Sequence, residues 1–217
     1  MSAPHIAPLP AAQDAAALAL LDQAFADDAT LAWYLFAERP GYDARRGAYL
    51  ASYQAFHRAN QLPTLAAWRA DRLVAVCYFS MPAQQASAAS LLRIGAEIRQ
   101  HCGDNCLARL DQLLAAFDQH LDQADCARIE FIGTAADLQG QGIGSALLGE
   151  CLGQLGASGC AKVALETAAP RNLALYQRHG FVQSGHLQLP GLQLYYLQAG
   201  LQADQHTARP LIASFEP

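Results

Sequence analysis

The chain has 217 residues, of which 53% are hydrophobic, so it can bury a sizeable core in one domain or in one domain with an elaboration. Its formal net charge is -5, and its 14 basic residues are scattered, with Arg45 and Arg46 as the one adjacent pair. Nucleic-acid binding needs a basic stripe, so no nucleic-acid partner is expected. No apolar run approaches the roughly 20 residues of a membrane-spanning helix, so no membrane partner is expected either.

The first part of the chain predicts two helices and a hairpin. Prolines in the first ten residues predict an irregular lead or an edge strand. Apolar residues at helical spacing predict helices over 11–25 and 45–60. Strands are predicted at 65–68 and 73–79, because the second run is rich in β-branched and aromatic residues.

A helical insertion is predicted at about 84–124, before the fourth strand. Leucine and phenylalanine recur there every three or four residues and form one broad apolar stripe. This stripe is interpreted as packing, not as chemistry. Its members are Leu107, Leu110, Leu114, Phe117 and Leu121.

The second half alternates between strands and helices. Parallel strands joined by helices and followed by an antiparallel pair predict an α/β fold with a central mixed sheet of six to seven strands, flanked by helices. A single domain over 1–200 and a C-terminal tail over 201–217 are expected. The predicted strands are 127–133, 161–167, 181–189 and 192–198, and the predicted helices are 143–157 and 171–179.

The six cysteines of the chain do not predict a metal site. His101, Cys102 and Cys106 lie close together, but they lack the paired Cys-x-x-Cys spacing of structural zinc sites. The sequence has no recognisable signal peptide, so reduced thiols and a cytoplasmic location are expected.

A glycine-rich turn in residues 138–148 predicts a phosphate site. Without Cβ atoms, the amides of a tight turn converge on a phosphate oxygen, and the following helix adds the positive end of its dipole. A nucleotide triphosphatase loop would need a lysine before Ser145, and none is near. A dinucleotide loop would follow its strand directly, whereas 134–138 intervene. The pattern that remains is Gln-x-x-Gly-x-Gly, formed by Gln139, Gly142 and Gly144.

A second motif follows in residues 165–181, where a strand end leads to Asn172, a short helix with Tyr176, and a Gly-Phe turn. Proline before the helix and glycine after it bracket two to three turns, and Asn172 and Tyr176 share one face. Together the two motifs resemble the GNAT-type N-acetyltransferase superfamily. Residues 24–28 and 33–35 are similar to the start of puromycin acetyltransferase-like members, where the first helix pair forms one wall of the acceptor pocket.

The resemblance implies that acetyl-coenzyme A is the cosubstrate. The glycine turn would bind its diphosphate, and the strand before it would pair with the pantetheine arm as if with an added strand. The amide of Ile132 would face the thioester carbonyl. The implied cofactor contacts are Ile132, Gly133, Thr134, Gln139, Gly140, Gln141, Gly142, Ile143, Gly144, Ser145, Asn172 and Tyr176.

Three residues are the candidates for proton transfer. Tyr176 is the expected general acid, since a thiol pKa of about 8.5 and a phenol pKa of about 10 are close enough for transfer in a dry site. Glu166 and Glu130 are the candidate bases, with Glu166 preferred, and either could instead be a structural partner of an arginine. Strict alternation would place Glu130, Ile132 and Thr134 on one strand face.

The expected activity is transfer of an acetyl group to a primary amine of a small molecule or peptide, by direct attack on the thioester. One alternative is a non-catalytic domain that binds or senses acyl-coenzyme A. Another is an acyltransferase that uses a longer acyl chain or a hydroxyl acceptor. A homodimer through the tail or the last hairpin is a further expectation.

Overall fold

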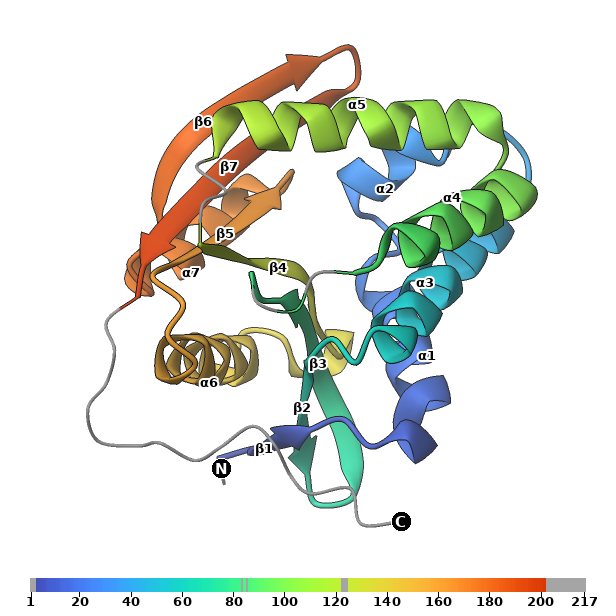
Figure 1. Ribbon diagram of the computed structural model, residues 1–217. Coiled ribbons are helices and arrows are strands. Elements are labelled where there is room, and N and C mark those ends of the chain that lie inside the picture. Colours follow the sequence, from blue (N-terminus) through green and yellow to red (C-terminus); the bar gives the residue numbers. More distant parts are fainter. Residues whose placement is uncertain (1–2, 83, 85, 122–124, 202–217) are drawn as a thin grey trace.

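The computed structural model describes residues 3–82, 84, 86–121 and 125–201, and the predicted tail from 202 on lies outside them (Figure 1). One seven-stranded sheet runs through the described part, in the order β1-β2-β3-β4-β5-β7-β6. Neighbouring strands are antiparallel except β4 and β5, which are parallel. The predicted mixed sheet of six to seven strands is confirmed. Its strands are β1 His5–Pro8, β2 Thr64–Arg69, β3 Arg72–Ser80, β4 Cys126–Thr134, β5 Lys162–Thr167, β6 Val182–Leu189 and β7 Leu192–Gly200.

Helices cover both faces of the sheet, and Figure 1 shows α6 and α1 on opposite sides of it. Two buried hydrophobic clusters result, one beneath α1 to α5 and the other beneath α6 and α7. The predicted insertion before β4 is confirmed as two helices, α4 and α5, which are separated at Gly103 with a φ of 95°. The helices are α1 Asp14–Ala24, α2 Ala29–Tyr34, α3 Tyr42–Ala59, α4 Ala88–Cys102, α5 Asp104–His120, α6 Ile143–Ala157 and α7 Leu173–Arg178.

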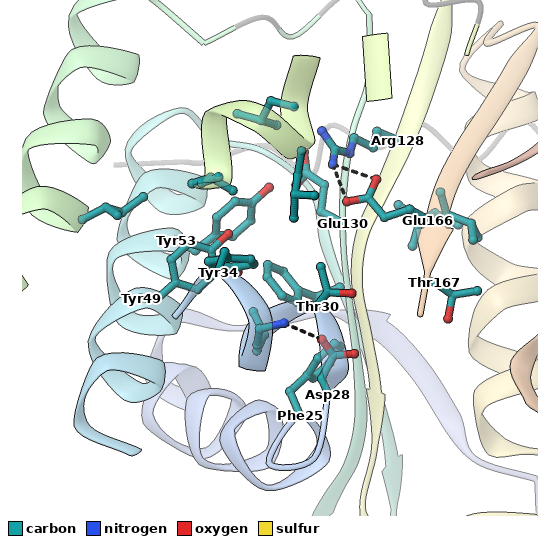
Figure 2. Close-up of a pocket in the computed structure, with 18 of the residues that line it drawn as sticks. Phe25, Asp28, Thr30, Tyr34, Tyr49, Tyr53, Arg128, Glu130, Glu166 and Thr167 are labelled. Atoms are coloured by element: carbon teal, nitrogen blue, oxygen red, sulfur yellow. Dashed lines mark hydrogen bonds and ion pairs between the residues drawn. The ribbon is translucent and has the colours of Figure 1, made fainter. Parts of the chain in front are cut away.

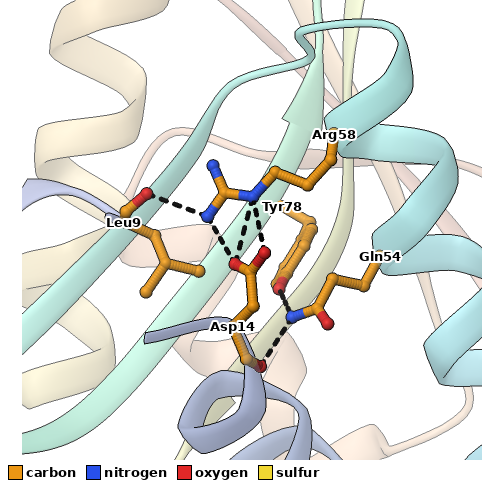
Figure 3. Close-up of polar contacts among 5 residues, drawn as sticks. All are labelled: Leu9, Asp14, Gln54, Arg58 and Tyr78. Carbon is orange, nitrogen blue, oxygen red and sulfur yellow. Dashed lines mark hydrogen bonds and ion pairs between the residues drawn. The ribbon is translucent and has the colours of Figure 1, made fainter. Parts of the chain in front are cut away.

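A polar network fixes α3 against α1 and the sheet (Figure 3). The Arg58 guanidinium pairs with the Asp14 carboxylate and donates to the Leu9 carbonyl at 3.0 Å. The Gln54 amide donates to the Asp14 carbonyl and to the Tyr78 hydroxyl, both at 2.9 Å. Since α3 also carries several side chains of the cavity described below, these bonds hold one wall of that cavity in place.

The two parallel strands separate partway along their length. Pairing between β4 and β5 runs from Cys126–Lys162 to Arg128–Ala164 and then stops, although β4 continues to Thr134 and β5 to Thr167. The backbone edges that face each other beyond this point are therefore free of sheet hydrogen bonds to one another. This divergence opens the sheet at its centre.

Candidate active site

The glycine turn forms the start of α6. Gly142 is the N-cap residue with a left-handed φ of 79°, and no side chain caps the helix. The first turn of a helix leaves its backbone N–H groups without intrahelical acceptors. These groups are therefore available to an anion at the positive end of the helix dipole.

Contacts around the turn fix its position against β4. A Cβ on Gly144 would lie 3.2 Å from the Thr134 hydroxyl, so glycine allows α6 to approach the end of β4 closely. The Gln139 side-chain amide donates to the Thr134 carbonyl at 3.3 Å. The side-chain amide oxygen of Gln141 accepts a hydrogen bond from the Arg69 guanidinium at 2.6 Å, which directs the Gln141 side chain toward the β2–β3 hairpin. The Ser145 hydroxyl lies 2.7 Å from His179 Nε2.

The free edge of β4 presents backbone groups of Ile132 and Thr134. The Ala135 N–H donates to the Val74 carbonyl of β3, and the register pairs Val76 with Gly133. Since backbone groups alternate sides along a strand, those of Ile132 and Thr134 point away from β3, toward the diverging β5. Pairing with an extended ligand, as the resemblance implied, is open to these two residues, whereas the N–H of Gly133 faces β3.

The space between the diverging strands is part of a cavity of about 470 Å³ (Figure 2). Tyr176 and Asn172 of the second motif line it, together with β4, β5 and helices α2 to α5. Both candidate bases line it too. The charged side chains among the described lining residues are Asp28, Asp111, Arg128, Glu130 and Glu166.

Glu166 forms an ion pair with Arg128, whose Nη2 lies 3.0 Å from each carboxylate oxygen (Figure 2). The side chains are 22% and 26% exposed, respectively. Burial raises the pKa of Glu166 above its usual value, and the charge of Arg128 opposes this rise. The arginine partnership that the sequence left open as an alternative is therefore present, and the carboxylate still borders the cavity.

Glu130 occupies a different environment. Burial alone would raise the pKa of Glu130, but the hydrogen bond and the charge of His57 reverse the shift, and its pKa is lowered. His57 Nε2 lies 2.5 Å from one carboxylate oxygen, and the Ser80 hydroxyl donates to the other at 2.9 Å. Glu130 therefore stays ionised to lower pH than Glu166.

The expectation that Glu130, Ile132 and Thr134 share one strand face is wrong. The β3–β4 register pairs Tyr78 with Phe131 and Phe79 with Ile129, which leaves Glu130 as the extra residue of a β-bulge. A bulge shifts the alternation by one residue. Glu130 therefore points to His57 on α3, whereas Ile132 packs in the cluster beneath α6.

Tyr176 is 5% exposed, and its ring packs edge-on against Phe181 at 5.8 Å. Burial raises the pKa of the Tyr176 hydroxyl well above the usual phenol value. The hydroxyl therefore stays protonated throughout the neutral range. Asn172 lies between a short 3₁₀ helix, Pro170–Asn172, and α7.

Three site residues were not recognised from the sequence. Asp28 caps α2 by accepting from the Leu31 N–H at 2.8 Å, and burial raises its pKa. His57 is 1% exposed, and its Nδ1 has no hydrogen-bond partner among the described residues. Arg128 could have been recognised from the sequence, because Arg128 and Glu130 are the two charged residues of a largely apolar strand.

Residues 23–181 match the family model of the Acetyltransferase (GNAT) family, which is more than half of the chain. The chain belongs to the GNAT acetyltransferase family. The two motifs that suggested this superfamily, at 138–148 and 165–181, lie within the matched range. Similarity to the puromycin acetyltransferase-like members in particular stays a prediction.

Solved structures of acetyltransferases share the fold. The histone acetyltransferase HPA2 and related acetyltransferase from Corynebacterium glutamicum has a TM-score of 0.67 and 18% identity, covering 97% of this chain and 100% of that one. Arylalkylamine N-acetyltransferase 2 from Aedes aegypti has a TM-score of 0.67 and 11% identity, and the match covers 93% of this chain and 100% of that one. The GNAT superfamily phosphinothricin acetyltransferase from Sinorhizobium meliloti, solved in complex with AcCoA, has a TM-score of 0.60 and 17% identity, and the match covers 99% of this chain and 96% of that one.

Two further observations concern metal and membrane. Within the part of the chain that the structure describes, no group of three or more His, Cys, Asp or Glu side chains could hold a metal ion. Among the described helices, none is both long and apolar enough to cross a bilayer.

Proposed function

We propose that the protein is an acetyl-coenzyme A-dependent N-acetyltransferase that transfers the acetyl group to a primary amine by direct attack on the thioester. The observation that carries this proposal is the position of Tyr176 and two glutamates around one cavity, at the place where β4 and β5 diverge. Membership of the GNAT family supports it. A small-molecule acceptor is favoured because the cavity has the size of a small-molecule site.

The glycine turn is proposed to hold the coenzyme. Amides of 140–145 would donate to the diphosphate, and no side chain caps this helix start in competition. The outward backbone groups of Ile132 and Thr134 would pair with the pantetheine arm, with Gln139 giving up its bond to the Thr134 carbonyl. Asn172, which lines the cavity, would contribute a polar contact. Acetyl-coenzyme A supplies the activated thioester.

The Ile132 N–H is proposed to stabilise the carbonyl oxygen as it gains negative charge. It points away from β3 into the opening between the strands, so it needs no reorientation at the moment of reaction. One such preorganised donor typically lowers a barrier by about 3 kcal/mol.

Glu166 is proposed as the base that takes a proton from the acceptor ammonium, directly or through a water. Its pKa is raised by burial, which makes the carboxylate a stronger base near neutral pH than Glu130, whose pKa is lowered. Arg128 would keep Glu166 oriented toward the cavity. Glu130 is the second candidate, and its bonds to His57 and Ser80 favour a positioning role.

Tyr176 is proposed as the general acid. The amine nitrogen forms a bond to the carbonyl carbon, the carbon–sulfur bond breaks, and the departing sulfur takes the phenolic proton. Its raised pKa keeps this proton in place until the thiolate forms. The resulting phenolate is far less stable in a buried site than the phenol, so reprotonation from solvent is favourable.

Thiol release from acetyl-coenzyme A in the presence of a panel of primary amines tests the proposal. The expected result is amine-dependent release that saturates with both substrates. Binding of acetyl-coenzyme A without release by any amine would point instead to an acyl-coenzyme A sensor. Preference for a longer acyl chain or for alcohols over amines would point to the other acyltransferase activity.

A further inference from the structure

The cavity has two chemically distinct regions. Charged side chains gather where β4 and β5 diverge, and Figure 2 shows Arg128 and Glu166 on one side of the cavity and the tyrosines of α2 and α3 on the other. The rest of the cavity is lined by aromatic and aliphatic side chains. Those from α3 to α5 include Tyr49, Tyr53, Phe56, Ile94, Ile98 and Leu110.

The charged region favours one positive charge. Asp28, Glu130 and Glu166 supply three carboxylates there, and Arg128 is the one cationic side chain among the described lining residues. Arg128 pairs with Glu166, and His57 behind the lining pairs with Glu130, so one carboxylate is left without an ion-pair partner in the described part of the chain. A carboxylate on the acceptor would meet repulsion from these groups. An ammonium would be attracted by them.

The apolar region has few groups that could pair with a second charge on the acceptor. From α4 and α5 the described lining includes one ionisable side chain, Asp111, which is exposed. A charge buried among the leucines and isoleucines would lose its hydration without gaining a partner, and this costs several kcal/mol. Short diamines and short amino acids, whose second charge would stay among these side chains and not reach Asp111 or solvent, are therefore disfavoured relative to amines with a plain apolar body.

The apolar lining continues to the surface between α4 and α5. Leu91 of α4 and Leu114 of α5 both line the cavity, yet they are 54% and 39% exposed. Single exposed leucines are common on protein surfaces, but two leucines that line the same cavity extend its apolar lining outward. They form an apolar rim where the far end of an acceptor would emerge.

We propose that the acceptor is a lipophilic monoamine, with one primary ammonium at the carboxylates and an aromatic or alkyl body along α4 and α5. This inference rests on the proposed N-acetyltransferase function and names its substrate class. The cavity of about 470 Å³ has room for a body of this kind.

A homologous series of amines tests the substrate class. From butylamine to octylamine, kcat/KM is expected to rise about fourfold per added methylene, as for transfer of a methylene from water to an apolar site. The butane diamine with an amine at each end and the amino acid of the same chain length are both expected to be at least about tenfold poorer than butylamine, because their second charge would lie within the apolar region. Equal efficiency for butylamine and its diamine would overturn the proposal.

Variants at the rim provide a matched comparison. Leu91→Gln and Leu114→Gln are expected to lower kcat/KM for octylamine about fivefold and to leave butylamine nearly unchanged. Leu92→Gln is the control, because Leu92 adjoins Leu91, is 76% exposed and is absent from the cavity lining. Acetyl-coenzyme A binding, measured by calorimetry, is expected to stay the same in all three.

The outcomes separate the two proposals. If Leu91→Gln and Leu92→Gln have the same effect on octylamine, or if short polar amines are the better substrates, the lipophilic acceptor is wrong and the N-acetyltransferase stands. If no amine in either series releases thiol, the proposed function fails, and the substrate class fails with it.

Discussion

In the proposed mechanism, departure of the thiolate depends on the hydroxyl of Tyr176. Replacing it with phenylalanine keeps the ring that packs against Phe181 and removes only the proton donor. We expect Tyr176→Phe to lower kcat about a hundredfold or more, the usual value of a general acid. The dissociation constant for acetyl-coenzyme A should change little. Steady-state kinetics with calorimetry checks both, and an unchanged kcat would remove Tyr176 from the mechanism.

The pH profile distinguishes the two glutamates. As the proposed base, Glu166 must be ionised, and its pKa is raised by burial, so activity should fall as pH drops through a value above the usual carboxyl range. The pKa of Glu130 is lowered, so its protonation should come at more acidic pH. We expect the acid limb of the kcat profile to disappear in Glu166→Gln, with a large loss of rate.

Glu130→Gln is the matched control for that profile. It should keep the acid limb at the same pH as the unmodified protein, even if its rate is lower, because the ionisation of Glu166 would still govern the limb. An acid limb that persists in Glu166→Gln and is lost in Glu130→Gln would assign the base to Glu130 instead.

At the level of elements, the start of α6 depends on close approach to β4. Gly144→Ala would bring a Cβ to 3.2 Å from the Thr134 hydroxyl, so either the first turn or the Thr134 side chain must move by a few tenths of an ångström. We expect the dissociation constant for acetyl-coenzyme A to rise about tenfold, equivalent to the loss of one hydrogen bond to a charged group. Isothermal titration calorimetry measures this change.

Gly153→Ala on the same helix is the control. A Cβ on Gly153 would have no atom within 4 Å apart from its chain neighbours and the backbone of its own helix, so the variant should bind acetyl-coenzyme A normally. It should also be more stable by about 1 kcal/mol, because alanine has a higher helix propensity than glycine. Equal effects of the two variants on binding would show that approach to Thr134 is not what the glycine provides.

The sequence predicted most elements because their signals are local. Apolar periodicity and turn residues located α6 at 143–157, as observed. The bulge at Glu130 could not be predicted, since it arises from the register of β4 against β3 and leaves no mark in β4 alone. Arg128 and Glu166 are 38 residues apart in sequence and lie on different strands, so only the sheet order reveals their pairing.

At the level of the whole molecule, α5 connects the N-terminal helices to the C-terminal hairpin. It packs against α2, α4 and β6 and lies alongside β6 and β7 in Figure 1. Its Phe117 packs against Tyr196 of β7 at 6.0 Å, and the Arg128 guanidinium lies 3.8 Å over the Phe117 ring. The apolar stripe of this helix was visible in the sequence, but a stripe does not identify the surface that it covers.

Phe117→Ala should therefore destabilise the fold. Phe117 is 2% exposed, and truncating a buried phenylalanine typically costs about 3–5 kcal/mol of unfolding free energy. Leu92→Ala on α4, at a site 76% exposed, should change stability by less than about 0.5 kcal/mol. Denaturant unfolding measures both, and a small effect of Phe117→Ala would mean that α5 is not an integral part of the core.

In the proposed complex, free backbone amides at the start of α6 bind the diphosphate of acetyl-coenzyme A while the thioester lies between β4 and β5. Calorimetry with acetyl-coenzyme A and with acetyl-pantetheine, which lacks the diphosphate and the phosphoadenosine attached to it, measures this contribution. Saturable binding of the first and much weaker binding of the second is the expected result. Absence of heat with acetyl-coenzyme A, or equal affinity for the two compounds, would contradict it.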